Sequence, residues 1–202
     1  MTRELVSGGQ HIHAPDDLNR LLQDIYDEAM TITSGKVADY IPALAEVNPD
    51  YCALTLATLD GEVFNVGDTK EHFSIQSVSK IFGLMLAMER LGDDLWQRVK
   101  MEPSGQAFNS IVQLEWEQGI PRNPMINAGA ILVSDVLVSH YSASKNAVLS
   151  LVRSLCGNDK IYADHDVHLS EKEHGHRNAA LAHLMKSFGN IESDVDELLD
   201  HY

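Results

Sequence analysis

The segment from residue 79 to residue 91 places the strongest constraint on the fold. Its hydrophobic residues occur nearly all round a helix instead of along one stripe: Ile81, Phe82, Leu84, Met85, Leu86, Ala87, Met88 and Leu91. A helix without a polar face is stable in water only when other elements cover it. We therefore predict a helix over residues 79–91 that is buried in the middle of the protein.

The segments around this helix predict an α+β protein. Residues 15–32 have the periodicity of an amphipathic helix. Residues 51–58 and 62–66 alternate as two strands, and Asp60-Gly61 between them is a strong hairpin signal. Further helices are predicted near residues 93–100, 108–118, 128–141, 145–156, 176–188 and 192–202. A hairpin followed mostly by helices indicates a sheet lobe and a helical lobe.

The start of the apolar helix carries a candidate catalytic pair. Ser77-Val78-Ser79-Lys80 is an S-x-x-K pattern, and residues three apart share one face of a helix, so the lysine amine can reach the serine hydroxyl. A serine needs an adjacent base to act as a nucleophile at neutral pH. A lysine can be that base where burial lowers its pKa. The N–H groups at the helix start can stabilise an oxyanion.

A short pattern of this kind is weak evidence by itself. The chain contains a second copy, Ser142-Ala143-Ser144-Lys145, in a polar stretch between two predicted helices. Serine is a favoured residue at helix N-termini, so we interpret this copy as an exposed helix cap. The first copy differs because a long apolar helix follows it.

Several blocks of the sequence resemble the serine-dependent glutaminase family. Residues 73–80, Phe-Ser-Ile-Gln-Ser-Val-Ser-Lys, are similar to the nucleophile motif of that family. The other similar blocks occur in the family's order and at similar spacing, at residues 35–42, 67–69, 102–105, 123–130 and 170–178. The resemblance extends from about residue 35 to the last residue.

The resemblance implies a role for seven residues. Ser77 is the implied acyl-forming nucleophile and Lys80 its proton acceptor. The residues implied to line the pocket and hold the substrate, L-glutamine, are Tyr40, Asn127, Glu171, Asn178 and Tyr202. The chemistry is consistent, because the α-ammonium of glutamine pairs with a carboxylate and its α-carboxylate with amide or hydroxyl donors. No cofactor is implied.

The family's fold is of the serine β-lactamase type, an antiparallel sheet lobe beside a helical lobe, and we expect one glutaminase domain over residues 1–202. Family members continue beyond the position where this chain stops. The resemblance implies that this further part holds the remaining strands, a second active-site tyrosine and an oxyanion N–H. We therefore expect an incomplete sheet and little or no turnover by the 202-residue chain. The resemblance also implies a homo-oligomer, a dimer or a tetramer.

The net charge of −15, from 15 basic and 30 acidic residues, argues against nucleic-acid binding because phosphates would be repelled. The first residues lack the apolar region of a secretory signal, and no apolar run is long enough to span a membrane. Cys52 and Cys156 are isolated, as expected of reduced cysteines. We therefore expect a cytoplasmic protein.

Three alternatives to a glutaminase follow from the same residues. The histidine pairs at 11 and 13, 165 and 168, and 174 and 176 could suggest a metal site, but no spaced Asp or Cys completes a ligand set, and we expect none. A β-lactam-processing serine enzyme would share the S-x-x-K pattern, although the chain has no Lys-Thr-Gly or Lys-Ser-Gly sequence. The third alternative is an inactive fragment whose exposed sheet edge binds a partner.

Overall fold

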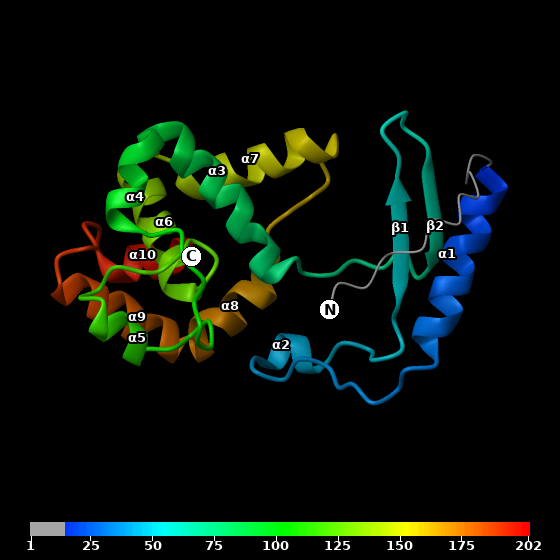
Figure 1. Cartoon of the computed structure of the whole chain (residues 1–202), viewed down its shortest axis with the longest axis horizontal. Coiled ribbons are helices and arrows are strands. Elements are labelled where there is room, and N and C mark those ends of the chain that lie inside the picture. Colours follow the sequence, from blue (N-terminus) through cyan, green and yellow to red (C-terminus); the bar gives the residue numbers. More distant parts are fainter. Residues whose placement is uncertain (1–14) are drawn as a thin grey trace, which may run out of the picture. The chain divides into compact units, whose positions relative to one another are not determined.

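The computed structural model describes residues 15–202, which form two compact units (Figure 1). The hairpin unit comprises the residues up to Asp39 together with Leu44–Phe73. The helical unit comprises Tyr40–Ala43 and Ser74–Tyr202. The chain changes unit three times, once within the short helix α2 (Pro42–Ala45). None of the helices within residues 15–202 has the length and apolar character required to cross a bilayer.

The hairpin unit consists of one helix and two antiparallel strands. Helix α1 (Pro15–Met30) packs along β2 (Val63–Gly67), which pairs with β1 (Ala53–Ala57) (Figure 1). The register sets Ala53 opposite Gly67, and Gly61 adopts a φ of 93° in the turn. The predicted hairpin and first helix are confirmed to within a few residues. Among the described residues, the sheet has these two strands.

The helical unit is built from helices joined by short loops. Its elements are η1 (Gln76–Val78), α3 (Ser79–Leu91), η2 (Gly92–Asp94), α4 (Leu95–Arg98), α5 (Val112–Trp116), α6 (Asn127–His140), α7 (Ser144–Cys156), α8 (His165–His174), α9 (His176–Ser187) and α10 (Val195–His201). All agree with predicted helices except two: the sequence analysis did not predict the single turn η1, and it missed α8. Its ten residues include few apolar side chains, so its periodicity is faint, and the carboxylate of Asp164 caps its start.

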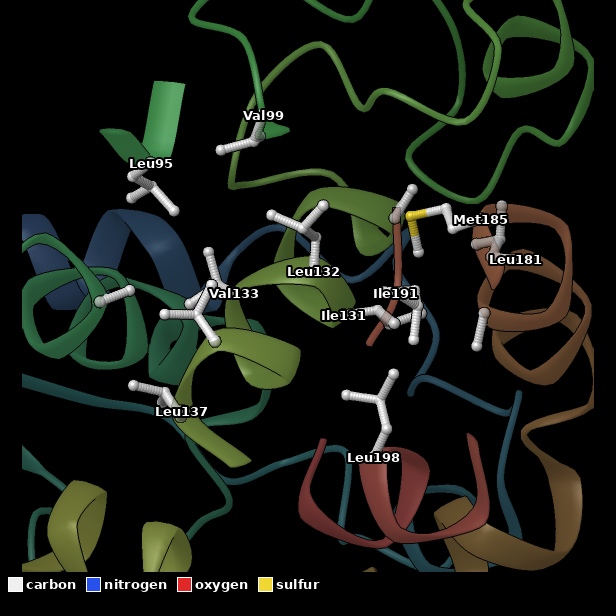
Figure 2. Packing of buried hydrophobic residues seen from close by; sticks show 14 of the residues in the cluster. Leu95, Val99, Ile131, Leu132, Val133, Leu137, Leu181, Met185, Ile191 and Leu198 are labelled. Atoms are coloured by element: carbon white, nitrogen blue, oxygen red, sulfur yellow. The ribbon is translucent and has the colours of Figure 1, made fainter. Parts of the chain in front are cut away.

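Helix α6, and not α3, is the buried centre of the helical unit. Every residue from Ala128 to Leu137 is buried, and side chains of α4, α9 and α10 converge on this helix (Figure 2). The prediction that residues 79–91 lie in the middle of the protein is wrong. Helix α3 packs one face against α6, and Ile81, Met85 and Met88 on its other side remain exposed. Apolar residues on all sides of residues 79–91 thus predicted the helix correctly but not how far it is buried.

One charged side chain lies inside this core. Asp135 of α6 is 0% exposed, and its carboxylate accepts a 2.6 Å hydrogen bond from Arg98 and a 2.8 Å bond from the backbone N–H of Ser193. The Arg98 guanidinium also donates to the carbonyl of Asn190 at 2.6 Å. A buried carboxylate is tolerated because these donors replace its water. The bonds fix the loop between α9 and α10 against α6.

Candidate active site

All seven predicted site residues belong to the helical unit. Ser77 lies in η1, Lys80 in the first turn of α3, and Asn127 is the first residue of α6. Glu171 lies in α8 and Asn178 in α9. Tyr40 precedes α2, and Tyr202 follows α10. The site therefore depends on how six separate segments pack, and a linear motif supplies only two of its members.

The Lys80 amine faces oxygen acceptors on α6 and on the loop before it. Its Nζ donates to the Asn127 side-chain oxygen at 2.8 Å and to the Met125 carbonyl at 3.0 Å, and the Phe108 ring centroid lies 5.9 Å away. Partial burial lowers the pKa of Lys80. Among the described residues, no hydrogen bond joins this amine to the hydroxyl of Ser77, which is exposed. Two of the three ammonium donors are thus held, and one is available for proton exchange.

Asn127 continues this chain of hydrogen bonds. Its side-chain NH₂ donates to the side-chain oxygen of Asn178 at 3.1 Å, which links Lys80 to α9. Asn127 does not cap α6, because the N-cap position is Ile126. The preceding turn is held by the Asn123 side-chain oxygen, which accepts from the N–H groups of Met125 and Ile126 at 3.0 and 3.1 Å. The Asn127 side chain therefore takes no part in capping α6, and its bonds go to Lys80 and Asn178.

A half-buried carboxylate lies near two tyrosines. Burial raises the pKa of Glu171. Burial and the charge of Glu171 raise the pKa of Tyr40, which remains 59% exposed. Burial of the Tyr202 phenol, with Glu171 and Tyr40 nearby, raises its pKa further, although 38% of the residue is exposed. A carboxylate with little water and neutral phenols around it is suited to a small ammonium group.

Neighbouring contacts hold these three residues in place. The Ser170 hydroxyl accepts a 3.3 Å hydrogen bond from the N–H of Ala43, which fixes the Tyr40 segment against α8. On the other side, Asp200 of α10 pairs with Lys145 at 2.5 Å and with Lys172 at 2.9 Å. Hydrogen bonds from these two lysines hold the pKa of Asp200 well below its usual range. Since Lys172 follows Glu171 and Asp200 lies two residues before Tyr202, the ion pair helps to place both site residues.

The second S-x-x-K copy has a different environment. Helix α7 begins at Ser144, and its N-cap residue Ala143 makes no side-chain bond, so the interpretation as a serine cap is wrong in detail. The Ser144 hydroxyl instead contacts Nδ1 of His201 at 2.9 Å, and the Lys145 amine is held by Asp200. These residues line a surface cavity of about 320 Å³. The Lys145 amine is bound by a carboxylate, whereas the Lys80 amine faces neutral oxygens, which separates this copy from the first.

Two further residues near the site were missed by the sequence analysis. The Gln76 side-chain oxygen accepts a 3.2 Å hydrogen bond from the Tyr40 hydroxyl, and Phe108 lies beside Lys80. Gln76 is part of the family-like block, which could have indicated it, whereas nothing in the sequence around Phe108 indicates a site. Within residues 15–202, no three His, Cys, Asp or Glu side chains are grouped to hold a metal ion, and the pair at 11 and 13 lies outside the described residues.

Comparisons with known proteins identify the family of the chain. The family model described as glutaminase matches residues 35–202. The chain is 54% identical over 187 residues to a glutaminase of Pseudoalteromonas translucida and 55% identical over 185 residues to one of Aliivibrio fischeri, covering 92% and 91% of this chain. It spans about 61% and 60% of the length of these two curated relatives.

Solved structures give the same result. The structure of a probable glutaminase has a TM-score of 0.87 at 30% identity, over 94% of this chain and 62% of that one. The structure of a Bacillus glutaminase has a TM-score of 0.76 at 32% identity, over 92% of this chain and 59% of that one. These neighbours confirm the predicted α+β fold of the serine β-lactamase-like type. On its sequence and on its fold, the chain belongs to the glutaminase family.

Proposed function

We propose that this protein hydrolyses L-glutamine to L-glutamate and ammonia through a glutamyl ester on Ser77. The observation that carries the proposal is the hydrogen-bonded chain from Lys80 through Asn127 to Asn178. It joins the base of the S-x-x-K pattern to the amides implied to hold the substrate. Family membership supports the same reaction, and no cofactor is required by it.

The first half of the reaction forms the ester. The Ser77 oxygen attacks the side-chain amide carbon of glutamine while its proton passes to the neutral Lys80 amine, whose pKa is lowered by burial. The oxyanion donors expected at the start of α3 are in part already used, because the N–H of Val78 donates to the Ile75 carbonyl and the N–H of Ser79 to the Gln76 carbonyl. When the C–N bond breaks, the proton moves from Lys80 to the leaving nitrogen, and ammonia departs.

The second half restores the enzyme. Water attacks the ester carbon and gives a proton to Lys80, and the tetrahedral intermediate collapses to release glutamate. The Ser77 oxygen recovers its proton from Lys80, so that no net charge or proton accumulates on the protein. One base therefore serves both half-reactions.

Substrate recognition is assigned to the groups around the base. Glu171 pairs with the α-ammonium, because its half-buried carboxylate lies near neutral phenols. The amides of Asn127 and Asn178 and the hydroxyl of Tyr202 donate to the α-carboxylate. Tyr40 lines the pocket between Glu171 and Gln76. Amides that lack the α-groups leave these polar side chains unpaired and are rejected.

The proposal extends to the setting of the enzyme. Residues 1–202, with both compact units, are assigned to one glutaminase domain. The intact protein is proposed to act in the cytoplasm as a homo-oligomer, a dimer or a tetramer. Size-exclusion chromatography with light scattering measures that assembly directly.

Ammonia release from L-glutamine tests the reaction. Two forms are compared, the 202-residue chain and a form extended by the segment that family members carry beyond it. We expect turnover by the extended form, little or none by the 202-residue chain, and loss of turnover in the Ser77→Ala variant of the extended form. Ser142→Ala alters the first serine of the second S-x-x-K copy and should leave turnover intact.

Reaction with penicillin separates a glutaminase from a β-lactam-processing enzyme. Penicillin hydrolysis or acylation of Ser77 by penicillin, without glutamine turnover, would instead identify a β-lactam-processing enzyme. A folded extended form that releases no ammonia from glutamine overturns the proposal. Circular dichroism of each variant shows whether a loss of activity reflects unfolding.

A further inference from the structure

Gln76, the residue before Ser77, has a left-handed backbone. Its φ is 45°, and among the described residues the only other non-glycine residue with a positive φ is Gln118, at 54°. This region is adopted freely by glycine but costs free energy in other residues, because Cβ crowds the backbone. A residue that is held there beside a proposed nucleophile indicates that surrounding contacts compensate the strain.

The side-chain amide of Gln76 makes those contacts at both ends. Its oxygen accepts from the Tyr40 hydroxyl at 3.2 Å, and its nitrogen donates to the Ser74 hydroxyl at 3.0 Å. The Gln76 carbonyl accepts a 2.7 Å bond from the Ser79 hydroxyl, at the first residue of α3. Glycine at this position would remove the backbone strain but also the bridge to Tyr40.

The bridge matters because the Tyr40 hydroxyl has two side-chain partners, Gln76 and Glu171, and only Gln76 adjoins the proposed nucleophile. Tyr40 precedes α2, 36 residues before Gln76, and most of its surface is exposed. The turn at Gln76 also sets the direction in which η1 presents Ser77. One residue thus fixes the nucleophile through its backbone and a pocket tyrosine through its side chain.

We propose that Gln76 is a positioning residue, whose left-handed turn and side-chain amide hold Ser77 and Tyr40 in register for the reaction. The inference rests on the proposed glutaminase function and adds a residue to its site. Gln76 acts through Ser77 and Tyr40, which its turn and its side-chain amide place. Its loss should therefore lower kcat through Ser77, and raise KM no more than the loss of the Tyr40 hydroxyl does.

Two substitutions separate the backbone from the side chain. Gln76→Ala removes the amide but keeps a Cβ in the left-handed region, and Gln76→Gly removes both the amide and the strain. We expect kcat to fall about tenfold or more in both, since small displacements of reacting groups cost large factors in rate, and KM to rise no more than in Tyr40→Phe. Gln76→Gly should melt at a higher temperature than Gln76→Ala because glycine relieves the backbone. Recovery of wild-type kcat in Gln76→Gly would overturn the role of the side chain.

A matched control and a double-mutant cycle sharpen the result. Gln118→Gly relieves the other strained glutamine, which is exposed in the loop after α5, and should raise the melting temperature without altering kcat. Tyr40→Phe removes the hydroxyl that donates to Gln76. If the amide acts through that hydroxyl, the losses in kcat of Gln76→Ala and Tyr40→Phe are not multiplicative in the double variant. Multiplicative losses contradict the bridge.

A second probe distinguishes failure of this inference from failure of the proposed function. The rate at which a fluorophosphonate labels Ser77 reports nucleophile placement without glutamine, and both assays use the extended form. Glutamine turnover with unchanged kcat in both Gln76 variants overturns the positioning role alone. Labelling of Ser77 that slows in these variants, without any turnover, supports positioning and overturns the glutaminase function. If neither glutamine turnover nor labelling of Ser77 is observed, both the positioning role and the glutaminase function are overturned.

Discussion

The amine of Lys80 donates a 2.8 Å hydrogen bond to the side-chain oxygen of Asn127, and this bond joins the first turn of α3 to the first residue of α6. It fixes the orientation of the asparagine, whose NH₂ group then points to Asn178. The proposed base and the proposed substrate-binding amides therefore form one continuous unit. A change at Asn127 should alter the base as well as substrate binding.

Asn127→Asp tests this coupling. A carboxylate of the same shape beside Lys80 favours the ammonium and raises the pKa of Lys80, by about one unit or more for an adjacent charge. Because the neutral amine accepts the proton, the rising limb of kcat/KM should move to higher pH. Asn178→Asp is the control, since Asn178 has no hydrogen bond to Lys80 in the structure and its change should mainly raise KM. An unshifted limb in Asn127→Asp would argue against Lys80 as the base.

The lowered pKa of Lys80 also predicts a pH dependence of stability. Burial lowers the pKa of Lys80 in the folded state below its ordinary value of 10.5. At a pH between the folded-state pKa and 10.5, the unfolded chain therefore binds more protons than the folded one. The free energy of unfolding contributed by this group therefore rises with pH across that window and carries the full penalty below the folded pKa. Lys80→Met should lack this rise in urea unfolding measured from neutral to alkaline pH. Parallel curves for the wild type and the variant would contradict the depressed pKa.

Gly129 should be intolerant of any side chain. A Cβ at this position of α6 would collide with the carbonyl oxygen of Asn123 and lie 2.7 Å from its carbon and 2.9 Å from Cα of Pro124. These are backbone atoms, so Gly129→Ala must displace the start of α6, with a loss of about 3 kcal/mol or more in unfolding free energy, as for overpacking in a core.

Gly83 of α3 provides the matched comparison for that substitution. Its added Cβ would make ordinary contacts with Val133 at 3.5 Å and Leu137 at 3.7 Å. Gly83→Ala should therefore be neutral or stabilise by about 0.5–1 kcal/mol through helix propensity. Urea denaturation of both variants measures the difference, and similar losses in the two would show that close approach at Gly129 is unimportant.

Asp135 should be the most sensitive charged residue in the core. Burial alone would raise the pKa of its carboxyl, but hydrogen bonds from Arg98 and the backbone at Glu192 and Ser193 hold the pKa below its usual range. Asp135→Asn should cost about 3 kcal/mol, because it leaves a partly buried arginine without its partner. The difference in unfolding free energy from wild type should shrink below about pH 4, where the carboxylate becomes protonated in the unfolded chain while it is still ionised in the folded one.

Glu192→Gln is the exposed counterpart of that change. Glu192 pairs with the same Arg98 at 3.5 Å, but its side chain is 66% exposed. Solvent screening limits such a pair, so its loss should cost less than about 1 kcal/mol. Equal effects of the two substitutions in chemical denaturation would contradict the assignment of Asp135 as the buried anchor.

Much of the local structure could be predicted from short-range patterns. The hairpin follows from alternation around Asp60-Gly61, and α3 runs over the predicted residues 79–91. Helix α8 was missed because a helix that packs mainly through polar and charged residues leaves little periodicity. Ser77 and Lys80 were already indicated by the S-x-x-K pattern, whereas the other five candidate site residues came from the family resemblance. The structure places all seven in one unit.

The sequence by itself determined the helices, the hairpin, the S-x-x-K pair and the family. Only the tertiary structure decided that α6 forms the centre, that Lys80 points to Asn127, and that Gln76 bridges to Tyr40. The reason is physical: hydrophobic periodicity is a property of neighbouring residues, whereas burial and hydrogen-bond partners depend on which distant segments pack together. A 47-residue separation between Lys80 and Asn127 leaves no local signal for the bond that joins them.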